Sequence, residues 1–303
     1  MLCTELAPIS TLSFGPPAPD AFEILVAGRP EPELLARRGL EALVVPFAGL
    51  PAITAERLEG YAALPVYNLH HNAAPTAELA LALLLAASKR LTPIERRFRA
   101  GDWSDRGRGD QALRLEGRRA LVLGYGAVGR RVARACAGLG MQVSAIARRA
   151  RHEDRRVQGP EALADLLPQT DALLLCLPAT PRTTGLIGAA ELAALPPQAI
   201  LVNVARGPIV DERALYAALR EGHLFGAGLD VWWRYPESRE RSGEMLLPSE
   251  LPFHELENVV LSPHRAGHVQ DNEERRSRDL ASLLRSLCAG EEPESRVDLS
   301  EGY

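Results

Sequence analysis

The sequence predicts an α/β protein built on parallel sheets, and three observations support this fold class. Short apolar runs bounded by glycine or proline alternate with helical patterns from residue 22 to residue 93. The same alternation resumes at residue 117 and continues to about residue 270, around a glycine-rich turn. Strands that alternate with helices indicate βαβ units, whose strands are parallel. The composition agrees, because 46% hydrophobic residues in a chain of 303 can fill the cores of two medium domains.

The first part of the chain is expected to contain three buried strands bounded by turn residues. They fall within residues 22–28, 40–51 and 64–69. A short helix within 54–60 is predicted to open at the capping residue Thr54. A long helix is predicted over 75–91, with Pro75 at its start. The polar segment 98–117, rich in glycine and charge, is interpreted as a crossover linker.

From residue 117 the pattern predicts further strands and helices in alternation. The strands fall within residues 119–126, 142–148, 171–179, 199–207, 225–232 and 258–264. The helices fall within residues 127–140, 160–169, 188–197, 211–222 and 271–287. The polar tail after the last helix is expected to pack back onto the first unit. We therefore predict one domain of residues 1–93 plus 271–303, and a second domain of residues 94–270.

Composition and charge exclude several classes of function. The net charge of −4 argues against a nucleic-acid protein that binds by neutralising phosphates. No apolar run reaches the ~18 residues that a membrane span needs, and the opening MLCTELAPIS lacks the basic and apolar regions of a secretory signal. The four cysteines do not stand at zinc-binding spacing. We therefore expect a cytoplasmic protein with reduced thiols, no metal, no membrane contact and no nucleic-acid partner.

Three glycines mark a dinucleotide-binding turn. Gly124, Gly126 and Gly129 stand at G-x-G-x-x-G spacing between an apolar strand and a helix. The first glycine makes the tight turn, the second lets the backbone approach a pyrophosphate, and the third lets helix and strand pack closely. The free N–H groups at the start of the helix would bind the anion. The alternative is a glycine-rich turn that binds no ligand.

The end of the following strand bears on which dinucleotide binds. An acidic residue about 20 positions after the glycines normally binds the adenosine ribose, and here that position holds Ala147. A neutral residue there does not repel a 2′-phosphate, and the guanidinium groups of Arg148 and Arg149 can bind one. The pattern therefore favours NADP over NAD. The alternative is that both arginines belong to a solvated basic run over 148–156.

The order of motifs from about Gly101 to Gly267 resembles that of the D-isomer-specific 2-hydroxyacid dehydrogenases. The matching segments are GDW, LEGRRALVLGYGAVGRRVA, LCLPATPRTTGLIG, LVNVARGPIVDERALYAALREGHLFGAGLDV and NVVLSPHRAG. The resemblance implies a Rossmann-type, doubly wound parallel sheet inserted into a smaller, flavodoxin-like substrate domain. That arrangement fits the two α/β units and the returning tail.

The resemblance implies roles for residues at matching positions. Arg206 is similar to the arginine that grips the substrate carboxylate, and its place after a strand agrees with this; the alternative is a salt bridge to an acid such as Asp211. His264 is similar to the family's acid/base, a task that suits an imidazole, although a lone histidine after a strand is more often structural. Asp230 is similar to the residue that orients the nicotinamide amide, and a strand-end cap is its alternative.

Further contacts are implied at other matching positions. Coenzyme contacts are expected, besides the residues already named, from Tyr125, Ala127, Val128, Leu177, Pro178, Val204, Ala205, His264, Ala266 and Gly267. The loop around Ala48, Gly49 and Leu50 resembles the family's carboxylate-binding loop, with an ordinary turn as the alternative, because this half of the chain departs most from the family. His70, His71 and Asn72 stand at the hinge to the long helix and are candidates to line the substrate cleft. Adjacent histidines without a third ligand do not predict a metal site.

One segment departs from the family pattern. The family places a glutamate, paired with the histidine, a few residues after LDV; here Tyr235 holds that position and Glu237 follows. Tyrosine could orient His264 by a hydrogen bond but cannot hold its cation, so we expect His264 to have a lower pKa than the family's histidine. Trp232 and Trp233 lie in the same segment. With Tyr235 they either wall a pocket for a bulky substrate or pack in an interface.

Two functions from different classes follow. The leading hypothesis is NADP-dependent reduction of a small 2-oxo acid to a D-2-hydroxy acid, with NAD as the less favoured coenzyme, Arg206 holding the carboxylate and His264 as acid/base. The alternative is an NADP-binding regulatory protein or sensor, which the missing glutamate favours and the retained Arg206 and His264 oppose. A formate-dehydrogenase-like enzyme is a lesser alternative. The resemblance also implies a homodimer formed through the nucleotide domain.

Overall fold

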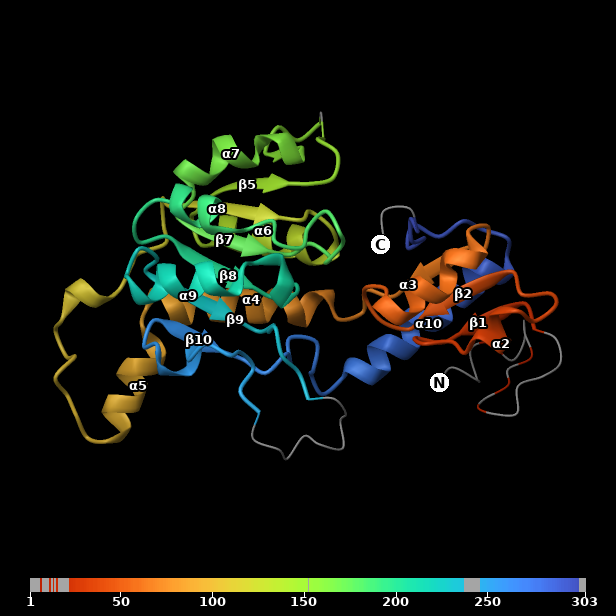
Figure 1. Ribbon diagram of the computed structural model, residues 1–303, viewed down its shortest axis with the longest axis horizontal. Coiled ribbons are helices and arrows are strands. Elements are labelled where there is room, and N and C mark those ends of the chain that lie inside the picture. The colour runs from red at the N-terminus through yellow and green to blue at the C-terminus, as the bar shows by residue number, and fades with distance from the viewer. Residues whose placement is uncertain are drawn as a thin grey trace. The chain divides into compact units, whose positions relative to one another are not determined.

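The computed structural model describes residues 6, 11, 13, 15, 22–151, 153–236 and 246–299. The chain divides into two compact units (Figure 1). The substrate unit, as we name it from the expected role, comprises Met1–Ala73 and Gly267–Tyr303, and the nucleotide unit comprises Ala74–Ala266. The long middle segment is thus an insertion into the chain of the first unit, as the resemblance implied.

The nucleotide unit is built on one parallel sheet with the order β10-β9-β8-β7-β4-β5-β6. Its strands are β4 Arg119–Leu123, β5 Gln142–Ile146, β6 Val157–Gln158, β7 Ala172–Leu175, β8 Ile200–Asn203, β9 Gly226–Leu229 and β10 Val259–Leu261. The strand order reverses direction between β4 and β7. In open α/β sheets ligands bind at such a reversal, beyond the carboxyl ends of the strands.

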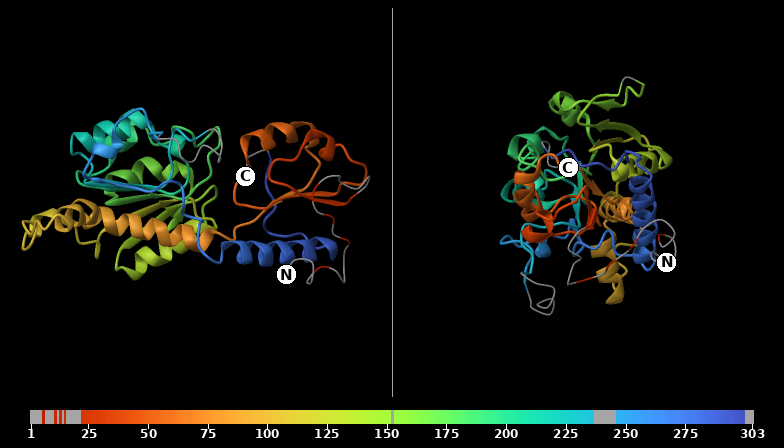
Figure 2. Two further views of the ribbon diagram at one scale, coloured as in Figure 1. Left: turned by 90° about the horizontal axis from the view of Figure 1, so that it is seen from below. Right: turned by 90° about the vertical axis from the view of Figure 1, so that its right-hand side faces the viewer.

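Helices cover both faces of this sheet (Figure 2). They are α4 Ala73–Ser88, α6 Ala127–Gly138, α7 Leu163–Leu166, α8 Ala189–Ala194 and α9 Glu212–Arg220. Helix α5 Leu91–Arg99 follows α4 and has Pro93 as its one buried residue. Successive residues of a strand point to opposite faces. Val122 of β4 therefore packs in one core with Leu84 of α4 and Val132 of α6. Leu121 packs in the other core with Leu215 of α9.

The substrate unit holds a smaller parallel sheet with the order β1-β2-β3. Its elements are β1 Ile24–Val26, α2 Pro32–Leu35, β2 Ala42–Val45, α3 Ala52–Leu58, β3 Val66–Asn68 and α10 Asn272–Cys288. Val44 packs with Leu284 of α10 on one face, and Leu43 packs with Leu58 of α3 on the other. The tail returns to β3, as predicted, where the N–H of Val297 donates to the Val66 carbonyl at 2.7 Å.

The first boundary between the units lies at Ala73, earlier than the predicted residue 93. The reason is packing, because α4 contributes Ala80 and Leu84 to the core of the nucleotide unit. A Cβ on Gly228 would lie 2.6 Å from the Leu83 Cβ, so the helix sits directly on β9. The second boundary, at Ala266, lies four residues before the predicted residue 270.

Two local predictions also need correction. The helix predicted over 75–91 ends at Ser88, because Arg90 takes a left-handed conformation with φ 53° and α5 begins at Leu91. Thr54 is not the cap of α3, which begins at Ala52 after Pro51. Its hydroxyl instead donates to the Gly28 carbonyl at 2.8 Å. No helix within the described ranges is long and apolar enough to cross a membrane.

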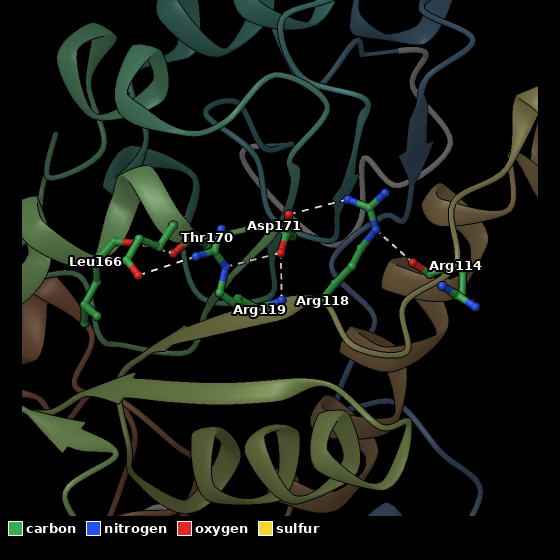
Figure 3. Close-up of polar contacts among 7 residues, drawn as sticks. Arg114, Arg118, Arg119, Leu166, Thr170 and Asp171 are labelled. Carbon is green, nitrogen blue, oxygen red and sulfur yellow. Dashed lines mark hydrogen bonds and ion pairs between the residues drawn. The ribbon is translucent and has the colours of Figure 1, made fainter.

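An acidic residue fixes the start of the central strands (Figure 3). Asp171 precedes β7, and its carboxylate accepts the backbone N–H of Arg119 at 2.7 Å. The guanidinium groups of Arg118 and Arg119 lie 3.5 and 3.7 Å from the same carboxylate. These contacts hold β4 and β7 in register at their amino ends, so that the turns at their carboxyl ends face each other.

Candidate active site

The glycine turn after β4 has the shape that the motif predicts. Gly124 has φ 92°, and a Cβ there would lie 2.6 Å from the Cys176 carbonyl oxygen after β7. A Cβ on Gly129 would lie 1.8 Å from the Gly124 oxygen, so helix α6 packs against the turn at a distance that only glycine permits. A Cβ on Gly126 would meet no described atom within 4 Å. The turn is closed on the protein side and open where a pyrophosphate would lie.

The first turn of α6 is suited to bind an anion. Among the described residues no side chain caps its N-terminus at Gly126, and its first turn holds no acidic residue. The N–H groups that the helix itself leaves unpaired and the helix dipole therefore favour a negative ligand there. Tyr125, Ala127 and Val128, from which coenzyme contacts are predicted, lie in or next to this turn.

The surroundings of the turn are rich in arginine. Ala147 follows β5, and Arg148 and Arg149 after it are exposed. The Arg151 guanidinium lies over the Tyr125 ring, 5.4 Å from its centroid.

Beside the turn runs a groove of about 320 Å³, whose lining includes Tyr125, Arg130, Arg134 and Arg156. Arg156 is paired with Asp154 at 2.8 Å, whereas Arg130 and Arg134 have no acidic partner in the described part of the chain. Positive charge is thus in excess along the lining of this groove.

The other predicted coenzyme residues follow neighbouring strands. Leu177 and Pro178 come after β7, Val204 and Ala205 after β8, and Ala266 after β10. Because the strands are parallel, all these turns lie at the carboxyl edge of the sheet, together with the glycine turn. Gly267 is the first residue of the returning segment of the substrate unit.

Arg206 is presented by a rigid turn after β8. The buried Asn203 side chain accepts the N–H of Ala205 at 3.0 Å and donates to the Arg206 carbonyl at 2.9 Å. The Arg206 guanidinium is exposed and donates to the Ala205 carbonyl at 2.7 Å. Within the described ranges it forms no ion pair, and the alternative partner Asp211 instead caps α9 by accepting the N–H of Ala214 at 2.8 Å. Asn203 thus fixes the turn that presents Arg206, a role that the sequence motif alone did not indicate.

Asp230 directly follows β9 and is fully buried. Its carboxylate accepts the N–H groups of Arg265 at 2.9 Å and Ala266 at 3.0 Å, and also the hydroxyl of Ser262. These three bonds fix the turn after β10 that carries His264. The side chain has no exposed surface, which favours the strand-end cap over direct contact with the nicotinamide.

His264 and Tyr235 meet at the same edge of the sheet. His264 is exposed and has φ 55°, a left-handed conformation that non-glycine residues rarely adopt. The Tyr235 ring lies 5.4 Å from the imidazole, centroid to centroid, and is tilted by 58°. The Tyr235 hydroxyl accepts the backbone N–H of Trp232 at 3.0 Å. Glu237, the other candidate partner of the histidine, lies outside the described residues.

The two tryptophans of this segment belong to the core and do not wall a pocket. Trp232 is 4% exposed and donates its indole N–H to the Ser262 carbonyl at 2.8 Å. Trp233 stacks on Phe253 at 5.5 Å and donates to the Val210 carbonyl at 3.0 Å. Of the three aromatic residues, only Tyr235, at 45% exposure, remains at the surface of the site.

The predicted substrate residues of the first unit lie in two loops. Ala48, Gly49 and Leu50 follow β2, where Gly49 has φ 81°. His70, His71 and Asn72 follow β3. His71 is 8% exposed, and its Nδ1 has no hydrogen-bond partner within the described ranges.

Burial, followed by the charge of Arg276, lowers the pKa of His71 below its usual value. No group of three metal-ligating side chains forms among the residues that the structure describes. A larger cavity, of about 490 Å³, includes Gln198, Phe225 and Asn258 in its lining. These residues precede β8, β9 and β10, so this cavity lies at the opposite edge of the sheet from the site.

Comparison with known proteins agrees with this geometry. The model of the D-isomer specific 2-hydroxyacid dehydrogenase NAD binding domain matches residues 81–266. A glyoxylate reductase of Korarchaeum cryptofilum is 35% identical over 227 residues, which cover 74% of this chain and 65% of that protein. A D-3-phosphoglycerate dehydrogenase of Mycobacterium leprae is 32% identical over 280 residues, which cover 92% of this chain and 49% of that protein. The chain thus spans about half to two thirds of the length of these relatives.

Solved structures show the same fold. A D-isomer specific 2-hydroxyacid dehydrogenase from Xanthobacter autotrophicus Py2, in complex with NADPH and MES, has a TM-score of 0.76 at 30% identity. The alignment covers 94% of this chain and 87% of that one. The TT0316 protein of Thermus thermophilus has a TM-score of 0.71 at 31% identity, over 91% and 85% of the two chains. The chain therefore belongs to the family of D-isomer-specific 2-hydroxyacid dehydrogenases.

Proposed function

We propose that the protein is an NADP-dependent reductase that converts a small 2-oxo acid to the D-2-hydroxy acid. The observation that carries this proposal is the grouping of Arg206, Tyr235 and His264 at the carboxyl edge of the sheet that bears the glycine turn. A guanidinium without an acidic partner among the described residues suits a carboxylate, and an exposed imidazole suits proton transfer.

The residues of the nucleotide unit fit a dinucleotide. Gly124 and Gly129 stand where a Cβ would overlap the backbone, and the N–H groups of the first turn of α6 are left for the pyrophosphate. Arg148 and Arg149 would bind the 2′-phosphate, and the neutral Ala147 would not repel it. When bound, the coenzyme supplies the hydride.

Arg206 would hold the substrate carboxylate through two parallel hydrogen bonds and orient the carbonyl beside it. Its turn is fixed by Asn203, so the guanidinium is directed without loss of backbone freedom on binding. The loop of Ala48, Gly49 and Leu50, in the substrate unit, is proposed to bind a substrate carboxylate through its backbone N–H groups.

His264 would protonate the carbonyl oxygen as the carbon is reduced. The three hydrogen bonds of Asp230 hold the turn of His264 in its left-handed conformation. Asp230 thus serves the imidazole by positioning it, which is the role that its burial supports.

The relatives support the chemistry of this proposal and a nicotinamide coenzyme. Among the curated relatives are glyoxylate reductases, and the Xanthobacter structure contains NADPH. A homodimer formed through the nucleotide unit is part of the same proposal. The tyrosine at the glutamate's position favours the second candidate, a protein that binds NADP as a sensor and turns over slowly.

The purified protein tests the proposal directly. We expect it to oxidise NADPH faster than NADH in the presence of 2-oxo acids, assayed from glyoxylate to phenylpyruvate, and to yield the D-2-hydroxy acid on chiral chromatography. Tight NADPH binding without turnover of any acid would favour the sensor. Formation of the L-2-hydroxy acid would contradict the proposed reduction to the D-2-hydroxy acid.

A further inference from the structure

We propose that the Tyr235 hydroxyl is a third hydrogen-bond donor of the site, which binds the 2-oxygen of the substrate and selects 2-oxo acids against 2-imino acids. The inference rests on the proposed function and adds a substrate-binding residue and a substrate class to it. It uses Tyr235 differently from the family's glutamate, which can only accept.

The first observation behind the proposal is the hydrogen bonding of the Tyr235 hydroxyl. The Tyr235 oxygen accepts the backbone N–H of Trp232 at 3.0 Å. A phenol has one hydrogen to donate besides the lone pairs with which it accepts. In the described part of the chain no acceptor takes that hydrogen. The hydroxyl is held in place by the hydrogen bond that it accepts, and its own hydrogen is available for donation to a ligand.

The second observation is the set of groups that surround the Tyr235 hydroxyl. Its ring lies 5.4 Å from the His264 imidazole, and the charges of Arg206 and Asp230 both act on its ionisation, so it stands among the groups of the site. Burial raises the pKa of Tyr235 above its usual value of 10.0. The hydroxyl therefore stays protonated at any pH at which the enzyme would work, as a donor requires.

The backbone that anchors the phenol is itself fixed beside Arg206. The Trp232 indole donates to the Ser262 carbonyl at 2.8 Å, which ties the segment to the turn of His264. A Cβ on Gly207 would lie 2.2 Å from the Trp232 carbonyl oxygen, so the turn of Arg206 packs on the same residue. One rigid segment thus holds the phenol in place relative to both Arg206 and His264.

The chemistry of the substrate gives the selectivity. A carbonyl oxygen has two lone pairs, so it can accept from His264 and from Tyr235 at once, and it gains negative charge as the carbon is reduced. A protonated imine presents an N–H and a positive charge at this position. The protonated nitrogen has no lone pair to accept the Tyr235 hydrogen, and its positive charge would be repelled by the Arg206 guanidinium. The site would therefore disfavour the imine.

Tyr235→Phe tests the role of the hydroxyl, because it keeps the ring against the imidazole. We expect kcat for the preferred 2-oxo acid to fall about 10- to 100-fold, since the lost bond strengthens as charge develops on the oxygen, with KM changed less than about 3-fold. Unchanged kcat would overturn the proposal. A raised KM at unchanged kcat would also overturn it, because the donor would then serve the carboxylate in the ground state.

Three further measurements separate this role from others. The pH profile of Tyr235→Phe should keep the shape of the wild-type profile, and a shifted profile would mean that Tyr235 acts only through His264, against the proposal. Reduction of pyruvate with methylamine, which forms an imine, should not slow in the variant, so the preference for the oxo acid should fall. An equal loss for both substrates would contradict the proposal. Tyr216→Phe, in the aromatic core near Phe253, is the matched control and should leave kcat unchanged.

Failure of this inference about Tyr235 can be told apart from failure of the proposed function. If the wild type reduces 2-oxo acids and Arg206→Ala and His264→Ala abolish this, the function stands whatever Tyr235→Phe does. If the wild type reduces only the imine, both the function and this inference fail.

Discussion

The buried carboxylate of Asp230 accepts the backbone N–H of Arg265 at 2.9 Å, and thereby fixes the turn that carries His264. Two strand ends are joined in this way, because Asp230 follows β9 and Arg265 lies beyond β10. The relationship makes the position of the proposed acid/base depend on a residue that has no exposed surface of its own.

Replacement of Asp230 should therefore affect both folding and turnover. Asp230→Ala leaves three donors without their acceptor, so we expect the free energy of unfolding to fall by roughly 2–4 kcal/mol. We also expect kcat to fall about 100-fold at a temperature where the variant is folded, because the imidazole is no longer held. Urea denaturation and steady-state kinetics measure the two effects. Normal kcat in a destabilised variant would mean that the turn of His264 is fixed by other contacts.

The glycine turn offers a matched pair of substitutions within α6. Gly129→Ala should weaken NADPH binding more than 10-fold and destabilise the fold, because its Cβ would lie 1.8 Å from the Gly124 oxygen. Gly138→Ala, at the other end of the helix, meets no described atom within 4 Å and should leave binding unchanged. We expect it to add about 0.5–1 kcal/mol of stability, since alanine is the better helix former. Fluorescence titration with NADPH distinguishes the two, and equal affinities would contradict the assigned shape of the turn.

Coenzyme choice should depend on the arginines after β5. In the double variant Arg148→Ala, Arg149→Ala we expect the Kd for NADPH to rise at least about 100-fold, with the Kd for NADH nearly unchanged, because two charge-assisted bonds to a phosphate, each worth about 1.5–3 kcal/mol, are lost. Arg155→Ala, in the same basic run, is the control and should change neither value. A wild type that binds both coenzymes equally would show that the run is solvated surface.

Asp171 should matter for stability alone. Its carboxylate lies at the amino ends of β4 and β7, away from the site, where it accepts the Arg119 N–H and faces two guanidinium groups. We expect Asp171→Ala to lower the free energy of unfolding by about 1–2 kcal/mol. The kcat of the folded variant should equal that of the wild type, and a reduced kcat would indicate that the ends of the two strands are coupled.

Folding stability should depend on pH through His71. Burial lowers its pKa in the folded state, whereas in the unfolded chain it titrates near 6.5. The unfolded state therefore binds more protons in acid, so the stabilisation is present above pH 6.5 and is lost as the pH falls. Arg276, Asp279 and Glu273 of α10 also act on this histidine.

His71→Gln removes this dependence. We expect the difference in unfolding free energy between wild type and variant to shrink from pH 8 to pH 5, by at most about 1.4 kcal/mol per pH unit. A difference between wild type and His71→Gln that is independent of pH would contradict a neutral, buried His71.

The sequence predicted the nucleotide unit well because its signals are local. The spacing of Gly124, Gly126 and Gly129 determines a turn, and the apolar strands around it are continuous in the chain. The break at Arg90 was missed because neither glycine nor proline marks it, although Pro93 just beyond it is typical of a helix start. The unit to which α4 belongs depends on packing against β9, which no local pattern contains.

The sequence names candidate site residues, but it does not contain the hydrogen bonds that hold them. Arg206 and His264 follow from motif positions, whereas the anchoring function of Asp230 depends on hydrogen bonds to residues 32–36 positions away in the chain. The adjacent Trp232 and Trp233 gave no sign of which aromatic side chain would be buried. Only the packing against Phe253 decides that both belong to the core and that Tyr235 remains at the site.

The most direct test of the central claim is kcat/KM for NADPH-dependent reduction of glyoxylate by Arg206→Ala against wild type. If the guanidinium holds the substrate carboxylate by two charge-assisted bonds, kcat/KM should fall about 1,000-fold. Arg213→Ala, an exposed arginine of α9, should leave it unchanged. A loss of less than about threefold in Arg206→Ala, with wild-type turnover intact, would contradict the account.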